Sequence, residues 1–311
     1  MSNPLVTILS PCYNVEEYLP QCIDSILRQT YHNLQVVLID DGSQDNTWNV
    51  MQEYAAKDSH IEIYHQENQG VATTRNNLLD RAKGDYVLFI DSDDWIESNM
   101  VDFLVNKAFE HNADVAMCGM VIDDAPVRPE YTESVLTQEE CIKAFLFHNE
   151  LRGSLWNKLI KTNLFHNVKF HCEISYGEDA LFCWHIFQKA KTVVMTNRQL
   201  YHYRMNNSSI SHQVFGRKKL TGHLAWTFIT EETAKWWPQY LNIAQARHCI
   251  EDTLLLRDAA HCHYQNMNDV KMLQKKIREL RHTLNDVEIT STKMRLYAVM
   301  ASYSYWLASK I

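Results

Sequence analysis

Acidic side chains gather in two short runs, and each run directly follows an apolar segment. Asp40 and Asp41 end one segment, while Asp91, Asp93 and Asp94 follow another. Carboxylates held close together repel each other unless a divalent cation or hydrogen-bond donors compensate them. Mg²⁺ and Mn²⁺ prefer oxygen ligands and often take further oxygens from a substrate phosphate. Because Asp91 and Asp93 are two residues apart at a predicted strand exit, we expect both to reach one such cation.

The elements that must position these runs can be read from the first 120 residues. Short apolar runs rich in Val, Ile, Leu, Tyr and Phe alternate there with amphipathic stretches, which predicts buried strands alternating with helices. This alternation is typical of a parallel α/β sheet with right-handed crossovers. The carboxyl ends of such strands line one edge of the sheet, where ligands bind. The expected strands are 5–9, 35–40, 61–64, 86–90 and 115–120.

Two local signals predict where helices begin and end in this region. Asn14 and Glu17 are spaced as a cap-and-return pair at the start of the first helix. Gly84 predicts the end of the third helix.

Further along the chain, prolines and acidic residues within 121–135 predict a loop or boundary, and a mixed segment follows up to about residue 215. Residues 216–311 have a helical pattern.

Composition excludes several classes of protein. The chain has 311 residues, of which 46% are hydrophobic, so we expect a globular fold with a sizeable core. A net charge of −8 argues against a nucleic-acid partner. Eight cysteines without a C-x-x-C pair, and no predicted signal peptide or membrane span, favour a cytoplasmic protein with reduced thiols. No G-x-G-x-x-G follows the first strand and no P-loop is present, which argues against a dinucleotide dehydrogenase or P-loop enzyme.

Four stretches, taken in order, resemble the inverting family 2 glycosyltransferases, which have the GT-A fold. They read VTILSPCYN at 6–14, VLIDDGS at 37–43, NQGVATTRN at 68–76 and FIDSDDW at 89–95. Weaker similarities follow at 156–158, 178–179 and 204–212. The resemblance covers roughly residues 4–215. It implies an α/β fold with a mostly parallel Rossmann-like sheet flanked by helices, followed by a C-terminal helical region.

The resemblance implies roles for single residues in binding a nucleotide-diphospho-sugar. Asp41 would accept a hydrogen bond from the base, and Arg75 would contact the nucleotide or Asp91. Asp91 and Asp93 correspond to the family's D-x-D motif and would bind Mn²⁺ or Mg²⁺, with Asp93 as the more direct ligand. The residues implied for donor binding are Pro11, Tyr13, Asn14, Asp41, Arg75, Asp91, Ser92 and Arg204.

Asp179 corresponds to the family's general base, which would take the proton of the acceptor hydroxyl while configuration inverts at the anomeric carbon. Its place at a predicted helix start favours the ionised form, although a helix N-terminal charge with no catalytic role is the simpler alternative. For Trp95 and Trp156, packing in the core is an equal alternative to a ligand contact. The residues assigned to the acceptor site or to a lid are Trp95, Trp156, Lys158, Glu178, Ser209 and His212.

The implied function is transfer of a sugar, with UDP-sugar as the expected donor, to a glycan or lipid-linked glycan acceptor of a bacterial surface polysaccharide such as capsule or lipopolysaccharide. The implied domains are a catalytic domain over 1–215, divided into a nucleotide-binding half (1–120) and an acceptor-binding half (121–215), and the helical region 216–311. A metal-dependent phosphatase or phosphotransferase and a non-catalytic nucleotide-sugar-binding protein are the alternatives. The position of the D-x-D motif after the fourth strand argues against the phosphatase.

The C-terminal segment 270–311 differs in charge from the rest of the chain. It contains eight basic residues against three acidic ones, and an aromatic-rich stretch follows the basic one. This combination is typical of a peripheral anchor on a membrane surface, here the inner face of the cell membrane. A homodimer interface, or packing of the apolar stripe within the protein, is the favoured alternative because apolar stripes usually bury against protein.

Overall fold

A computed structural model of the chain describes residues 3–128, 130–147, 151, 153–205, 215–285 and 291–310. The chain forms two compact units. The first comprises Met1–Cys141, Ser154–Cys172 and His185–Asn207, and the second comprises Ile142–Gly153, Glu173–Trp184 and Ser208–Ile311. The division differs from the one expected at residues 215 and 216, because two earlier segments belong with the C-terminal helices.

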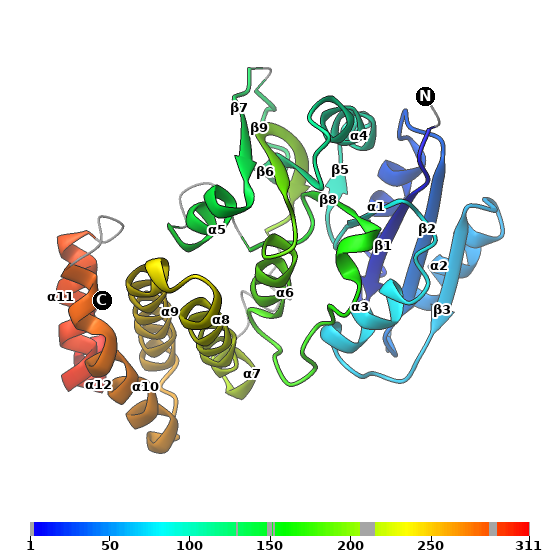
Figure 1. The fold of residues 1–311 in the computed structure, drawn as a ribbon. Coiled ribbons are helices and arrows are strands. Elements are labelled where there is room, and N and C mark those ends of the chain that lie inside the picture. The colour runs from blue at the N-terminus through cyan, green and yellow to red at the C-terminus, as the bar shows by residue number, and fades with distance from the viewer. Residues whose placement is uncertain are drawn as a thin grey trace. The chain divides into compact units, whose positions relative to one another are not determined.

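One sheet organises the first unit (Figure 1). Its nine strands, counted over the described residues, follow the order β3-β2-β1-β4-β8-β6-β9-β5, with β7 paired to β9. The strands β1 to β4 and β6 confirm the five predicted ones. The bounds are β1 Val6–Cys12, β2 Leu34–Asp40, β3 Ile61–His65, β4 Tyr86–Phe89, β5 Trp95–Ile96, β6 Val115–Ile122, β7 Glu133–Thr137, β8 Lys158–Lys161 and β9 Thr192–Tyr203.

The sheet is parallel in its first half and mixed in its second. β3, β2, β1 and β4 pair in parallel, as predicted. β8 is antiparallel to both β4 and β6, and β5 and β7 are antiparallel to β9. The expected α/β fold is confirmed, and its sheet is mixed beyond β4, where only β6 and β9 pair in parallel among the described strands. The strands β5, β7 and β8 have two to five residues and no clear local pattern, so long-range pairing decides their direction.

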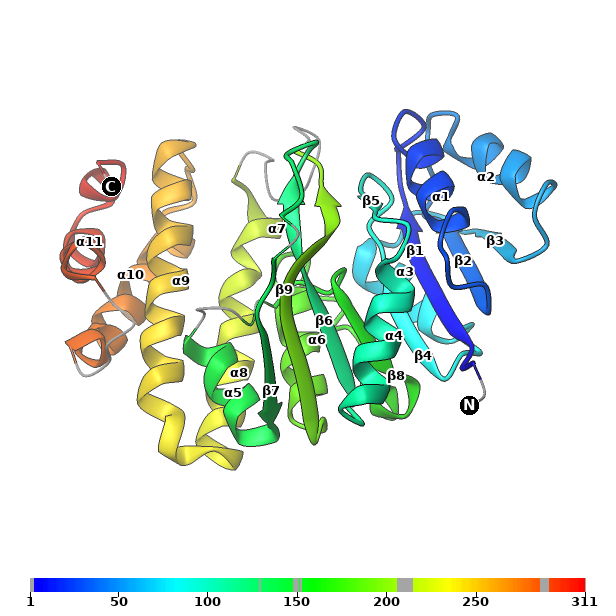
Figure 2. The ribbon, with the colours of Figure 1, turned by 90° about the horizontal axis from the view of Figure 1, so that it is seen from above.

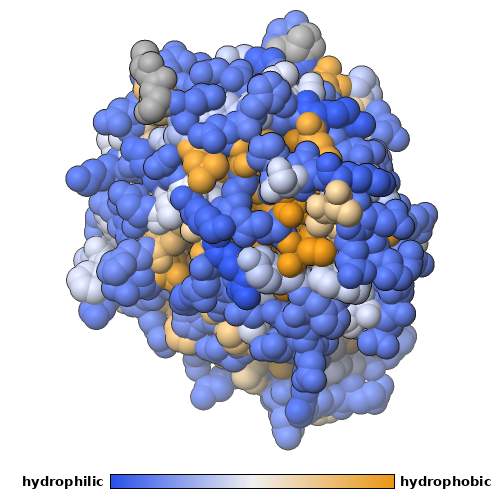
Figure 3. Space-filling model, turned by 90° about the vertical axis from the view of Figure 1, so that its right-hand side faces the viewer, coloured by the Kyte–Doolittle hydropathy of each residue, from blue (hydrophilic) through white to orange (hydrophobic). Residues whose placement is uncertain are grey.

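Helices cover both faces of this sheet. The alternate residues Val6 and Ile8 of β1 share a buried cluster with α1 (Leu19–Leu27) and α4 (Met100–Glu110). Figure 2 shows α1 and α4 in front of the sheet, with α3 (Val71–Leu79) behind it. The remaining helix, α2 (Thr47–Ala55), packs beside β3. Figure 3 shows the molecule from the side on which β3 and α2 lie in Figure 1. Hydrophilic side chains surround a central apolar group on this face.

Both predicted helix limits in this unit are wrong. Asn14 does not cap α1 with Glu17: it has a positive φ of 51°, and its side chain accepts a hydrogen bond from the Gln44 N–H at 2.8 Å. The helix α3 ends at residue 79, five residues before Gly84. Gly84 instead lies against the start of β1, where an added Cβ would come within 2.6 Å of the Leu5 carbonyl oxygen. Close backbone packing, not a helix end, requires glycine there.

The second unit is helical, as expected from residue 216 onward. The helix α9 lies at its centre and contacts α8, α10, α11 and α12. Figures 1 and 2 both show α8 beside α9. The bounds of the remaining helices are α5 Gln138–Phe147, α6 Glu178–Phe187, α7 Arg217–Leu220, α8 Gly222–Trp236, α9 Leu241–His261, α10 Met267–Leu280, α11 Thr292–Tyr303 and α12 Tyr305–Ala308. Short 3₁₀ turns occupy Pro238–Tyr240 and Arg281–Asn285 in this unit and Thr162–Phe165 in the first unit.

The C-terminal apolar residues fall into two groups. The stripe on α10, formed by Leu273, Ile277 and Leu280, is buried in the core shared with α9. This confirms packing within the protein for the stripe. Large apolar side chains on the next two helices stay exposed: Leu296, Val299, Tyr303 and Trp306. Within the described residues, no helix combines the length and the apolar character that crossing a bilayer requires.

Candidate active site

The strand ends that carry the polar motifs lie at one edge of the sheet. β2, β1 and β4 are adjacent and parallel, and Cys12 at the end of β1 stands opposite Asp40 at the end of β2. The Asp41 N–H donates to the Cys12 carbonyl at 2.8 Å, and the Ser92 hydroxyl donates to the Pro11 carbonyl at 2.8 Å. The loops after all three strands are therefore tied together, as their sequence positions predict.

Asp41 holds the loop that leads into α3. It is 4% exposed. Its Oδ1 accepts from Gln66 Nε2 at 2.8 Å and from the Gln69 N–H at 2.9 Å, and its Oδ2 accepts from the Gly70 N–H at 2.9 Å. Gly70 is the residue just before α3, so Asp41 also fixes the start of that helix. Oδ2 retains acceptor capacity, and a contact of Asp41 with a nucleotide base stays a prediction.

The predicted donor-binding loop after β1 is held by the loop after β2. The Asn14 N–H donates to Ser43 Oγ at 2.9 Å, and Tyr13 beside it is 47% exposed. Asp40 is fully buried and bound to His65 Nδ1 at 2.7 Å, so its carboxylate has a structural role. Gly42 has a φ of 73°, a conformation that favours glycine. The hydrogen bond between Asn14 and Ser43 thus supports the loop from which the exposed Tyr13 side chain projects.

Arg75 contacts Asp91, as predicted. Arg75 lies on α3 and is 7% exposed, and its Nη2 is 3.2 Å from Asp91 Oδ1. The Phe170 ring lies beneath the guanidinium at 5.7 Å. The backbone N–H of Asp91 donates to the Tyr201 hydroxyl at 3.2 Å. The first carboxylate of the D-x-D motif is thus oriented by a buried arginine and by β9.

Asp94, the third aspartate of the acidic run after β4, is part of this centre. It is 1% exposed, accepts from the Tyr201 hydroxyl at 2.6 Å and accepts from the Arg204 N–H at 2.8 Å. Burial, reinforced by the negative charges of Asp91 and Asp93, raises the pKa of Asp94 to about 8. Three carboxyl groups therefore influence one another at this strand end, which is the setting that a bound cation stabilises.

Arg204 is held beside the acidic motif by contacts from several segments. Its Nε donates to the Asp93 carbonyl at 2.7 Å, and its Nη2 donates to Gln21 Oε1. The guanidinium lies 4.9 Å from the Tyr18 ring and 4.6 Å from the Trp95 ring. The sequence placed Arg204 near the diphosphate only by resemblance, and it gave no signal for Tyr18, Gln21 or Tyr201.

The two predicted tryptophans pack against neighbouring rings. Trp95 stacks on His202 with ring centroids 4.8 Å apart, and Trp156 stacks on Tyr201 at 4.3 Å. These contacts fit the packing alternative, and a ligand contact of either ring stays a prediction. Lys158 on β8 is fully buried and donates to the Ser154 carbonyl and to Asn157 Oδ1. Its assignment to an acceptor site stays a prediction.

Glu178 and Asp179 lie at the start of α6 and belong to the second unit. Asp179 is part-exposed, and its Oδ1 accepts from the Ala180 N–H at 2.7 Å. Gly177 before them has a positive φ of 81°. The predicted position at a helix N-terminus is confirmed, while the role as a base stays a prediction. Ser209 and His212, assigned to a lid, lie outside the described residues.

The family model for glycosyl transferase family 2 matches residues 7–175, more than half of the chain. The chain belongs to this family. The match contains the four motifs of the sheet edge apart from Val6, the first residue of the first motif, and it ends before Asp179 and Arg204. Membership argues against the phosphatase alternative.

Among curated proteins, this family 2 chain is 34% identical over 217 residues to the uncharacterized glycosyltransferase EpsJ of Bacillus subtilis, covering 67% of this chain and 63% of EpsJ. It is 30% identical over 243 residues to the cholesterol galactosyltransferase of Borreliella burgdorferi, covering 73% and 68% of the two chains. The aligned region thus spans less than two thirds of EpsJ.

Solved structures share the fold. S. aureus TarS matches with a TM-score of 0.73 at 19% identity, over 97% of this chain and 89% of the TarS chain. A complex of the same protein with UDP-GlcNAc matches with a TM-score of 0.69, also at 19% identity and with the same coverage of both chains. The α/β sheet with flanking helices and a C-terminal helical region is therefore a GT-A-like fold, with a mixed sheet.

Proposed function

We propose that this chain transfers a sugar from a nucleoside-diphosphate donor, with UDP as the nucleotide, to a hydroxyl acceptor, and that configuration inverts at the anomeric carbon. The observation that carries the proposal is the convergence of Asp91, Asp93 and Asp94 beside Arg75 and Arg204 at one edge of the sheet. Carboxylates for a cation and guanidinium groups for phosphate oxygens together suit a diphosphate.

The donor set fits a resident Mn²⁺ or Mg²⁺ ion. Hard cations of this kind take carboxylate oxygens, and burial together with the negative charges of Asp91 and Asp93 raises the pKa of Asp94 to about 8. Asp91 and Asp93 would hold the ion. Such an ion neutralises the charge that develops on a departing diphosphate.

The remaining chemistry falls to side chains of the chain itself. Asp179 would accept the acceptor's hydroxyl proton while the acceptor oxygen bonds to the anomeric carbon and the bond to the diphosphate breaks. Its place in the first turn of α6 stabilises the ionised carboxylate that a base requires. Arg204, anchored to Asp93 and Gln21, would contact the diphosphate. Tyr13, exposed on its supported loop, would contact the nucleoside.

We propose that the acceptor belongs to a bacterial surface glycan whose precursors are carried by the membrane. The relatives include a putative teichuronic acid biosynthesis glycosyltransferase, TuaG of Bacillus subtilis, at 27% identity. On α11, Leu296, Val299 and Tyr303 recur at helical spacing and are exposed, with Lys293 one turn before them. An exposed apolar face with a basic flank is suited to an anionic membrane surface. We propose that α11 and α12, which exposes Trp306, make this contact at the inner face of the cell membrane.

Thermal unfolding with a panel of nucleotides, with and without Mn²⁺, tests the donor proposal. UDP at a hundredfold excess over its dissociation constant should stabilise the chain by about 2.7 kcal/mol, and only when Mn²⁺ is present. Asp93→Asn should abolish this shift, while exposed Asp124→Asn should keep it. Stabilisation by UDP that is equal without metal, or that survives in Asp93→Asn, would contradict the assignment of the D-x-D motif. A donor screen with a mass-spectrometric readout then identifies the sugar.

A further inference from the structure

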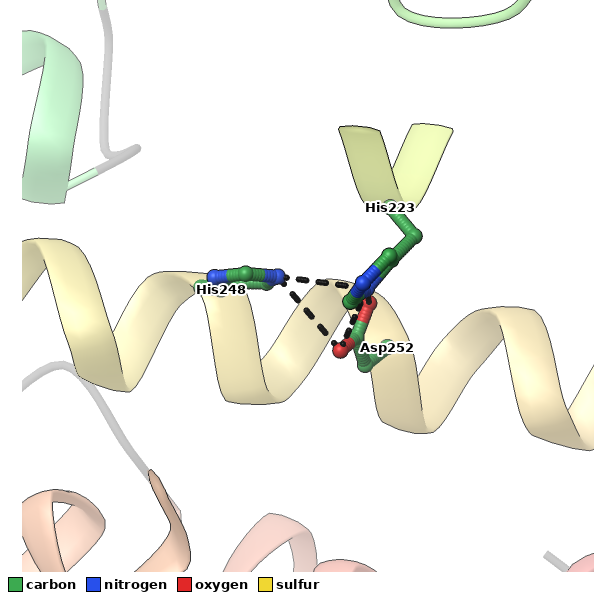
Figure 4. A group of neighbouring side chains, drawn as sticks. All are labelled: His223, His248 and Asp252. Carbon is green, nitrogen blue, oxygen red and sulfur yellow. Dashed lines mark hydrogen bonds and ion pairs between the residues drawn. The ribbon is translucent and has the colours of Figure 1, made fainter. Parts of the chain in front are cut away.

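Three polar side chains converge in the core of the second unit (Figure 4). His223 comes from α8, and His248 and Asp252 lie one turn apart on α9. They are 7%, 1% and 0% exposed, respectively. The matched family model ends at residue 175, and no step of the proposed transfer uses these residues. Their burial calls for a physical reason, because histidine and aspartate are costly to bury without compensation.

The atoms that face one another are spaced like ligands of one metal ion. His223 Nδ1 is 2.9 Å and 3.0 Å from the two carboxylate oxygens of Asp252. His248 Nε2 is 3.4 Å from His223 Nδ1 and 3.4 Å from Asp252 Oδ2. Around a tetrahedral Zn²⁺ with bonds of about 2.05 Å, neighbouring ligand atoms lie about 3.3 Å apart. The triangle formed by these three side chains therefore has the size of one face of such a site.

A neighbouring threonine sets the tautomer of His248. The Thr230 hydroxyl donates its only hydrogen to the Trp226 carbonyl at 2.7 Å. Its oxygen lies 3.3 Å from His248 Nδ1 and can only accept there, so Nδ1 carries the ring hydrogen. Nε2 then presents a lone pair towards His223 and Asp252. A partner that fixes the outer nitrogen of a histidine is a regular feature of metal-binding histidines.

Without a metal, the cluster has too few ring hydrogens to place one between each pair of facing nitrogen and oxygen atoms. His223 Nδ1 can donate one hydrogen, and Asp252 at 2.9 Å is the nearer acceptor. The lone pair of His248 Nε2 then faces Asp252 Oδ2 at 3.4 Å without a hydrogen between them. Lys276 of α10 acts on both groups through its charge, and the neighbouring Glu251 is paired with Arg247 at 2.6 Å.

We propose that His223, His248 and Asp252 bind a structural Zn²⁺ ion that joins α8 to α9. Two imidazole nitrogens and a carboxylate form a ligand set that suits zinc and related divalent transition metals. The second oxygen of Asp252, also within 3.0 Å of His223 Nδ1, can complete the coordination. The ion would compensate the buried carboxylate and would stabilise the helical unit. The alternative is a metal-free histidine–aspartate pair that contributes packing and one hydrogen bond.

The test uses the full chain with Asp91→Asn and Asp93→Asn, so that the acidic motif of the first unit takes no metal. The chain is dialysed against a chelator, loaded with Zn²⁺ alone and passed through a desalting column, and bound metal is counted by mass spectrometry. We expect one equivalent of zinc and a higher unfolding temperature. Loading with Co²⁺ should give the intense visible absorption of a tetrahedral site.

Variants locate the ion. His248→Gln and Asp252→Asn should each lower zinc affinity at least about tenfold. The matched control is His261→Gln, because His261 is exposed on the same helix and belongs to the His-Cys-His sequence at 261–263. This control should keep the zinc.

Three results would overturn the proposal: a folded parent chain that retains no zinc and gains no stability from it, full zinc retention in both cluster variants, or equal loss in His261→Gln. If a cluster variant fails to fold, the Co²⁺ spectrum and the zinc-dependent unfolding temperature of the parent chain still decide the question.

Discussion

Replacing Asp41 by asparagine tests whether this carboxylate holds the loop before α3. In the native structure it accepts three hydrogen bonds from Gln66, Gln69 and Gly70. An amide has only one acceptor oxygen. Its NH₂ group would therefore face either the Gly70 N–H or the two donors from Gln66 and Gln69. One buried N–H then loses its acceptor, and the surviving bonds lose their charge assistance.

The magnitude follows from these contacts. A hydrogen bond to a charged group contributes about 1.5–3 kcal/mol, and charge-assisted bonds are about twice as strong as neutral ones. Asp41 is 4% exposed, so solvent screening reduces these values little. We therefore expect Asp41→Asn to lower the free energy of unfolding by about 2–4 kcal/mol, a large part of the 5–15 kcal/mol that stabilises a typical protein.

Urea unfolding measures the loss, and amide hydrogen exchange locates it. The protection of the Gln69 and Gly70 amides and of the first turn of α3 should fall in Asp41→Asn more than the protection of β6. The matched control is Asp124→Asn, an exposed aspartate, which should change stability by less than about 0.5 kcal/mol. If Asp41→Asn behaves like this control, the loop is held by other contacts and the reasoning is refuted.

Three further predictions address pH, catalysis and the membrane. Because burial raises the folded-state pKa of Asp94 to about 8, from about 3.9 in an unfolded chain, chelator-treated protein should lose on the order of several kcal/mol of stability as pH rises from 4 to 8. Asp94→Asn should flatten this slope in urea titrations, and an unchanged slope would show that Asp94 is not its source. Asp179→Asn should retain Mn²⁺-dependent UDP binding and lose turnover at least about a hundredfold, so full turnover would exclude it as the base. Tyr303→Ser with Trp306→Ser should reduce co-flotation with anionic vesicles at least threefold, whereas Trp236→Ser, another exposed tryptophan, should not; equal flotation of both variants would refute contact through α11 and α12.

Much of the first unit could be predicted from the sequence because its signals are local. The strands β1, β2 and β4 are mostly apolar runs, and such runs are expected when both faces of a strand are covered. Parallel neighbours bring their carboxyl ends together, so the motifs after β1, β2 and β4 had to meet once those strands formed. The contact between Arg75 and Asp91 followed from the same placement.

Tertiary structure decided the features that depend on distant segments. The burial of Asp94 depends on Tyr201, which lies 107 residues further along the chain and reaches it from β9. The antiparallel direction of β8 follows from its two neighbours, β4 and β6, because a strand of four residues carries too few side chains to specify a partner. The convergence of His223 with His248 and Asp252 depends on how α8 packs against α9. Local sequence patterns report periodicity within a segment, whereas these contacts depend on which segments pack together.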